Sequence, residues 1–352
     1  MPNLPVIVDD THQQHDPPFE LNAGERVAPV YERPARVDAI RVALRAAGAI
    51  ELAPTPADDA AVTAVHDAGM LSFLATGYDA WRAAGGPEVM IPDTFRSPAW
   101  GRGGRATRSP LGAAGWYCTD TATPIVAGSY AAARAAVDIA CTAVDLVVAG
   151  APAAYGLTRP PGHHAGRDYL GGFCLLNHAA IAARRLAGAG GRVAIIDVDV
   201  HHGNGTQDVF WEDPDVLYLS VHTDPDHQYP FFSGFTDELG AGAGQGTTRN
   251  LPLAPGTDDA GFLGAVEVMC ELTTAFDPAA VVVSLGFDAA EADPLGQLAV
   301  TAAGYAGLGR LLGALDRPTV LLQEGGYALE AIGALAVATL DGLEAARPTT
   351  GS

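Results

Sequence analysis

The stretch RVAIIDVDVHHGNG, residues 192–205, decides the fold of this 352-residue chain. Its apolar first half is typical of a strand buried inside a parallel sheet. Its polar second half is typical of the loop that follows such a strand. Because ligands bind beyond the carboxyl ends of the strands in open α/β sheets, this stretch predicts both the sheet and the place of its site.

The rest of the chain alternates strands and helices in the same way. Four more β-branched runs are expected to form strands: PVIVD at 5–9, VLYLSVH at 216–222, AAVVVSLGFD at 279–288 and TVLLQEGG at 319–326. Alanine- and leucine-rich stretches are expected to form helices, for example Ser129 to Val148, Leu175 to Leu186, Ala260 to Ala275 and Thr301 to Leu315. The alternation predicts an α/β fold with a central, mostly parallel sheet and helices on both faces.

One domain spanning residues 1–352 is the favoured organisation, since no Ser/Gly linker or charge run marks a boundary. Two smaller domains are the alternative that the length leaves open. The stretch from Gly85 to Gly115 contains Gly, Pro and Arg and has little periodicity, so it predicts a long surface insertion. Loops of this length are often functional, but a tolerated insertion is the alternative.

The chain is acidic, with 41 Asp and Glu against 20 Lys and Arg and a formal net charge of −21. This charge argues against nucleic acid or an anionic membrane as a partner and favours a cationic ligand, although solubility alone also accounts for it. The four cysteines lack CxxC spacing, and the first ten residues lack a secretory pattern. With no apolar run of membrane-spanning length, the sequence predicts a cytoplasmic protein with reduced thiols.

The polar half of the opening stretch predicts a metal site. Asp197, Asp199 and His201 occupy alternate positions at the end of a strand, so their side chains can share one face. Asp288 ends another apolar run and can supply a third ligand, which leaves positions open for water and substrate as a catalytic zinc requires. The same ligands suit iron(II), cobalt or manganese. The alternative is that these residues only cap strands and turns, but buried unpaired carboxylates are costly.

Two adjacent histidines, His163 and His164, lie in the loop RPPGHHAG at 159–166, which its prolines and glycines make rigid. Imidazole titrates near neutral pH, so one ring can take a proton from water and one can deliver a proton to a leaving group. Tyr327 follows two glycines in QEGGY, where its hydroxyl can stabilise an oxyanion or can simply pack at the start of a helix.

Five segments together resemble the histone deacetylase family, and more narrowly its bacterial acetylpolyamine amidohydrolase branch: RPPGHHAG, GGFCLLNHAAIAA, DVDVHHGNGTQDVF, GFDAAEADPLG and QEGGY. The resemblance extends to VHDAGML, DTATPIVAGSY and GAGAGQGTTRNLPL, and so runs through nearly the whole chain. It implies an arginase-like α/β fold and a zinc-dependent amidohydrolase that removes an acetyl group from an amine.

The resemblance also implies which residues hold ions. Asp199, His201 and Asp288 are expected to bind one zinc ion, and Tyr327 is expected to polarise the acetyl carbonyl. A structural potassium ion is expected on a further set, the carbonyl oxygens of Asp197, Asp199, His201 and Val221 with help from Ser220.

The remaining implied roles concern the attacking water and the substrate chain. His163 and His164 are expected to flank the water, with Asp197 orienting His163 and Asn204 giving His164 a neutral partner. A second-shell partner of this kind fixes the tautomer and the basicity of an imidazole. The narrow tunnel for the substrate is expected to be lined by Gly172, Phe173 and Tyr229.

Acetylated polyamines are the favoured substrates, because an acidic chain suits a small cationic acetylated amine. Acetyl-lysine in proteins and a specialised metabolite are the alternatives. The resemblance implies a homodimer whose insertion narrows the entrance, where Glu88 and Asp93 could meet a cationic tail, although SPLGAAGWY at 109–117 lacks an acidic residue. Two other classes are less favoured: a ureohydrolase with two manganese ions would need a DxHxD set that is absent, and a non-catalytic sensor would lack a ligand or Tyr327.

Overall fold

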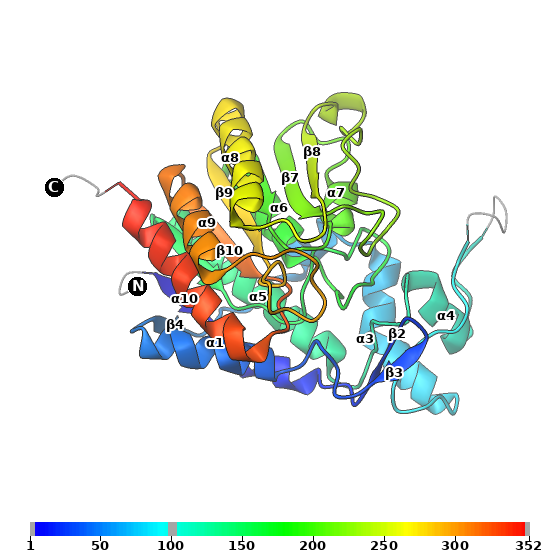
Figure 1. Ribbon diagram of the computed structural model, residues 1–352. Coiled ribbons are helices and arrows are strands. Elements are labelled where there is room, and N and C mark those ends of the chain that lie inside the picture. The colour runs from blue at the N-terminus through cyan, green and yellow to red at the C-terminus, as the bar shows by residue number, and fades with distance from the viewer. Residues whose placement is uncertain (1–3, 98–103, 349–352) are drawn as a thin grey trace.

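A computed structural model describes residues 4–97 and 104–348 (Figure 1). Within them, eight strands form one sheet in the order β4-β1-β5-β10-β9-β6-β7-β8. Every pairing in this sheet is parallel. The strands are β1 (Pro5–Ile7), β4 (Ile50–Leu52), β5 (Ala153–Gly156), β6 (Val193–Asp197), β7 (Val216–Thr223), β8 (Thr248–Leu253), β9 (Ala280–Leu285) and β10 (Thr319–Gln323).

Helices cover both faces of the sheet. They are α1 (Ala35–Ala46), α2 (Asp59–Thr63), α3 (Ala68–Ala83), α4 (Pro110–Tyr117), α5 (Ser129–Val148), α6 (His178–Ala189), α7 (Asn204–Val209), α8 (Asp259–Phe276), α9 (Ala302–Ala314) and α10 (Leu329–Ala346), with short 3-10 turns η1 (Asp10–Gln14) and η3 (Gly242–Gly244). In Figure 1, α1, α8, α9 and α10 lie in front of the sheet, and α5 and α6 lie behind it.

The central strands β5, β6, β9 and β10 are mostly apolar and fully buried, because helices cover both of their faces. In β6, Val193 and Ile195 belong to the hydrophobic cluster that contains α3, α5 and α6. The intervening Ala194 and Ile196 belong to the cluster that contains α1, α8, α9 and α10. Successive side chains of a strand point to opposite faces, so a continuous apolar run is what two buried faces require.

The predicted helices agree with the structure except at their ends. Ser129–Val148 is helical as expected, whereas the helix expected from Leu175 begins at His178. The Oδ1 atom of Asn177 accepts a hydrogen bond from Ala180 N at 2.9 Å and so caps that helix. The sequence patterns above do not predict the antiparallel hairpin of β2 (Glu20–Asn22) and β3 (Glu25–Val27), whose strands have three residues each.

The sheet places the loops that follow β6, β9 and β10 side by side, because these three strands are neighbours. Asp197 at the end of β6 is in register with Ser284 of β9 and Ser220 of β7. The insertion expected from Gly85 to Gly115 contains the start of α4, and its residues 98–103 lie outside the described residues. No helix in the described part of the chain is long and apolar enough to cross a membrane.

Candidate active site

The three predicted zinc ligands lie together at the carboxyl end of the sheet. His201 Nδ1 is 3.0 Å from Asp199 Oδ1 and 3.3 Å from Asp288 Oδ2. Asp199 and His201 follow β6, and Asp288 follows β9. All three side chains are buried, and each offers a ligand atom within 4.8 Å of the others.

The surroundings of this cluster fit a cation. Asp199 Oδ2 accepts a hydrogen bond from Gly325 N at 2.7 Å, and Asp288 Oδ1 accepts one from Val200 N at 3.0 Å. Among the described residues, Asp288 Oδ2 has no hydrogen-bond partner. Burial and the nearby Asp199 raise the pKa of Asp288 to about 7. Two buried carboxylates and one imidazole are a donor set that can hold zinc or another divalent cation, whose charge would offset the repulsion between the carboxylates.

His163 is held by a carboxylate. Its Nδ1 atom lies 3.0 Å from Asp197 Oδ2, which also accepts a hydrogen bond from the Tyr218 hydroxyl at 3.2 Å. Burial opposes protonation of His163, but the charges of Asp197 and Asp199 outweigh it and raise the pKa of His163 to about 10. The carboxylate of Asp197 therefore favours the protonated form of His163.

His164 has the opposite character. Its Nδ1 atom lies 2.7 Å from Asn204 Oδ1, and its ring centroid lies 4.0 Å from that of His163. Burial, followed by the positive charges of His163 and His201, lowers the pKa of His164 well below its ordinary value. Since the amide oxygen of Asn204 only accepts, Nδ1 carries the proton and Nε2 is free to accept one. The two adjacent rings thus differ in their partners, a carboxylate for His163 and an amide for His164.

A cavity of about 400 Å³ opens over these groups. Its walls include the predicted tunnel residues Gly172, Phe173 and Tyr229. The Tyr229 ring meets the ring of His164 edge to face at 4.9 Å between centroids. Gly172 has φ +56°, and a Cβ atom there would come within 2.3 Å of the His164 ring, so only glycine fits this position.

Tyr327 also lines the cavity, beside Phe173 at 5.7 Å between ring centroids. Its backbone N–H donates to Asp293 Oδ2 at 2.6 Å, and the Arg36 guanidinium lies 4.7 Å from its ring centroid. Burial raises the pKa of Tyr327 well above its ordinary value. The hydroxyl therefore keeps its proton and can donate a hydrogen bond to a developing oxyanion.

Two residues at the site were not singled out by the sequence patterns. Asp120 Oδ2 accepts hydrogen bonds from Gly172 N at 2.6 Å and from the Tyr229 hydroxyl at 3.0 Å, so it orders the tunnel wall. Gln228 Nε2 lies 2.9 Å from His201 Nε2, behind the predicted zinc ligand. The only signal for Asp120 is its place in DTATPIVAGSY, one of the family-like segments.

The two acidic residues that are expected to meet a cationic tail at a dimer entrance lie on the surface of this chain. Glu88 and Asp93 are exposed, and neither lines the cavity. Asp93 Oδ1 instead accepts a hydrogen bond from its neighbour Thr94 at 3.1 Å.

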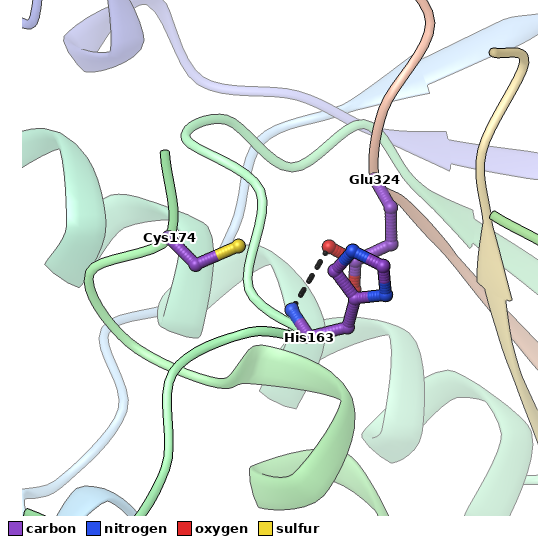
Figure 2. A group of neighbouring side chains, drawn as sticks. All are labelled: His163, Cys174 and Glu324. Carbon is purple, nitrogen blue, oxygen red and sulfur yellow. Dashed lines mark hydrogen bonds between the residues drawn. The ribbon is translucent and has the colours of Figure 1, made fainter. Parts of the chain in front are cut away.

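A second buried group consists of His163, Cys174 and Glu324 (Figure 2). Glu324 Oε2 accepts hydrogen bonds from Gly162 N at 2.6 Å and from His163 N at 3.2 Å. Burial raises the pKa of the Cys174 thiol well above its ordinary value, so it stays protonated. Because a metal needs a thiolate and Glu324 Oε2 is already bonded to the backbone of the histidine loop, we assign this group to support of that loop.

Comparison with known proteins gives one family. The model of the histone deacetylase domain matches residues 30–343. Acetylpolyamine amidohydrolase 1 of Pseudomonas aeruginosa is 39% identical over 342 residues, which are 97% of this chain and 99% of that protein. The acetylpolyamine amidohydrolase of Mycoplana ramosa is 41% identical over 330 residues, which are 93% of this chain and 96% of that protein.

The fold has close counterparts among solved structures. The crystal structure of an acetylpolyamine aminohydrolase from Burkholderia pseudomallei matches with a TM-score of 0.93 and 39% identity, covering 98% of this chain and all of that one. The HDA15 HD domain matches with a TM-score of 0.79 and 32% identity, covering 97% of this chain and 91% of that one. The predicted deacetylase-like α/β fold is confirmed.

Proposed function

This chain belongs to the histone deacetylase family, and from that membership we propose that it is a zinc-dependent enzyme that hydrolyses the acetyl-amide of small cationic amines, with acetylated polyamines as its first substrates. The observation that carries the proposal is the adjacent pair of histidines with unlike partners: His164 is bonded to Asn204 and His163 is bonded to Asp197. Both rings lie beside the predicted zinc ligands under one cavity.

The metal would be held by Asp199, His201 and Asp288. A zinc ion there supplies Lewis acidity, which makes a water molecule nucleophilic at neutral pH and polarises an acyl carbonyl. Two histidines of the chain would transfer protons. His164 Nε2 takes the proton of the attacking water, and His163 gives its proton to the nitrogen of the departing amine.

Atoms balance in this reaction. The water oxygen bonds to the acetyl carbon, the carbon–nitrogen bond breaks, and the products are acetate and the free amine. The Tyr327 hydroxyl donates a hydrogen bond to the oxygen of the tetrahedral intermediate. Gly172, Phe173 and Tyr229 hold the chain of the substrate and exclude water around it.

The proposal includes a structural potassium ion on Asp197, Asp199, His201, Ser220 and Val221. It is supported by Ser220, which lies opposite Asp197 in the β6–β7 register. His222 Nε2 lies 2.9 Å from the carbonyl oxygen of Gly234 and therefore carries the ring proton. His222 Nδ1 then accepts a hydrogen bond from the Ser220 hydroxyl at 2.8 Å. The lone pairs of Ser220 Oγ then remain available to a cation.

The substrate class rests on charge and on the relatives. Three relatives named acetylpolyamine amidohydrolase are 39 to 41% identical over nearly their whole length. The formal net charge of −21 would attract a polyamine. We include in the proposal a single deacetylase domain over residues 1–352, a cytoplasmic location and a homodimer formed through the insertion at 85–115.

The test is acetate release by the zinc-loaded protein from acetylputrescine, acetylspermidine and an acetyl-lysine peptide, measured side by side. We expect turnover of both polyamines, slower turnover of the peptide, and none by His164→Ala. Preference for the peptide would move the protein to the lysine deacetylases. Failure with all three substrates would contradict the proposal and favour a specialised metabolite or a sensor.

A further inference from the structure

The histidine loop, residues 162–166, is held by hydrogen bonds to side chains that come from distant parts of the sequence. The N–H groups of Gly162 and His163 donate to Glu324, and Figure 2 shows the bond from His163. The N–H of His164 donates to Cys174 Sγ at 3.4 Å. Backbone groups inside a protein must be paired, and here side chains do most of that work in place of a sheet or a helix.

The other end of the loop is bonded by Asn177. This residue is fully buried, and its Nδ2 donates to the carbonyl of Ala165 at 2.9 Å and to Thr206 Oγ1 at 3.0 Å. Its Oδ1 caps helix α6 at Ala180 N. One amide therefore fixes the helix start and the histidine loop relative to each other, and both of its functional groups are satisfied.

His66 also bonds this end of the loop. It lies 111 residues before Asn177, in the segment VHDAGML, and is 2% exposed. Its Nδ1 lies 2.9 Å from the carbonyl of Gly166, and its Nε2 lies 2.9 Å from the backbone N of Asn177. A carbonyl only accepts and an N–H only donates, so the ring is neutral with the proton on Nδ1.

We propose that His66 and Asn177 are positioning residues for the histidine pair: together they fasten the carbonyl oxygens of Ala165 and Gly166 and so fix where the rings of His163 and His164 stand. The proposal rests on the proposed function for its effect on catalysis. Neither residue lines the cavity, so neither touches substrate. Displacing a catalytic group by about 1 Å costs on the order of 100-fold in rate, which makes rigid support of the loop valuable.

Three variants test the hydrogen bonds of His66 and Asn177 one at a time. His66→Leu removes the bond to Gly166, whereas His66→Asn keeps a donor at the position of Nδ1. Asn177→Ser keeps an acceptor for the helix cap and loses the donor to Ala165. Leu312→Ala is the control, because it opens a cavity in the core at α9 and lowers the melting temperature without touching the loop.

Kinetics are the first readout. We expect His66→Leu and Asn177→Ser to lower kcat about 10- to 100-fold, with KM within about twofold of the wild type. His66→Asn and Leu312→Ala should keep kcat within about threefold. An equal loss of kcat in Leu312→Ala, or no loss in the first two variants, would overturn the proposal. If His66→Leu does not fold, Asn177→Ser decides the outcome.

Hydrogen exchange is the second readout, and it needs no activity. In His66→Leu and Asn177→Ser, the amides of the peptide covering residues 159–166 should exchange at least about tenfold faster than in the wild type. In Leu312→Ala, their exchange rates should be unchanged. Unchanged exchange in both loop variants would contradict the proposal even if their activity fell. If the wild type deacetylates nothing, the proposed function fails, while exchange still decides whether this pair holds the loop.

Discussion

Asn204 holds His164 in a single neutral tautomer, with Asn204 Oδ1 2.7 Å from His164 Nδ1. The neighbouring His163 instead faces the carboxylate of Asp197 at 3.0 Å. An amide beside one ring and a carboxylate beside the other favour a proton acceptor at His164 and a proton donor at His163, and the charges around the two rings act in the same sense.

Asn204→Asp should reverse part of that division. A carboxylate beside His164 stabilises its protonated form and raises its pKa, and a base works only when it is unprotonated. The acidic limb of the kcat/KM profile should therefore move to higher pH, with little change in zinc content. Rate profiles of the wild type and the variant check this, and an unmoved limb would show that His164 is not the base.

Tyr327→Phe should lower kcat about 100- to 1,000-fold, because one donor to the oxyanion is lost. The ring would still pack against Arg36 and Phe173, so zinc content and KM should change little. Tyr117→Phe is a matched control, since Tyr117 is equally buried at 8% exposed but lies on α4. Turnover equal to the wild type in the Tyr327 variant would remove the tyrosine from the mechanism.

Gln228→Leu should weaken zinc binding about 10- to 100-fold, because residues that contact the second nitrogen of a ligating histidine orient its ring. Gln228 lies 2.9 Å from His201 Nε2 and is itself fixed by Leu295 O at 2.9 Å. Competition with a chelator of known affinity measures the effect. Gln297→Leu is the control, since Gln297 bonds Gln228 but not His201; a similar loss there would point to general loosening of the loop.

His66 should make stability depend on pH. Burial lowers the pKa of His66 to about 4 in the folded protein, below its ordinary value of 6.5. Between these pH values the unfolded chain binds the proton more tightly than the folded chain does. The contribution of the neutral His66 to the free energy of unfolding is therefore complete above pH 6.5 and is lost as the pH falls toward 4. Metal-free wild type should lose about 2 kcal/mol more than His66→Asn between pH 7 and pH 5. Urea unfolding at both pH values tests this, and equal losses would disprove it.

The sequence predicts the parts of the site that follow strands. Asp199, His201 and Asp288 stand directly after apolar runs, and parallel strands bring such ends together. The histidine pair is marked by its own glycines and prolines. These signals are local in the sequence. Because the strands that carry them are neighbours in the sheet, the residues after their ends lie close together.

Other parts of the site depend on contacts that no local pattern encodes. Asp120 reaches Gly172 across 52 residues, and His66 reaches Gly166 across 100. Each partner is a backbone group, which any residue type provides, so neither sequence position reveals the contact. Glu88 and Asp93 illustrate another limit of local patterns: both side chains lie outside the cavity of their own chain, and their place at the entrance of a dimer stays a prediction.

Gly172, which has no side chain, limits how the tunnel can be redesigned. Any side chain there would push the His164 ring aside, so this wall cannot be built inward. Room for altered selectivity lies in the hairpin, where Leu21, Asn22 and Ala23 border the same cavity. Variation among homologues that prefer different amines is therefore expected to concentrate in that hairpin, while the glycine stays invariant.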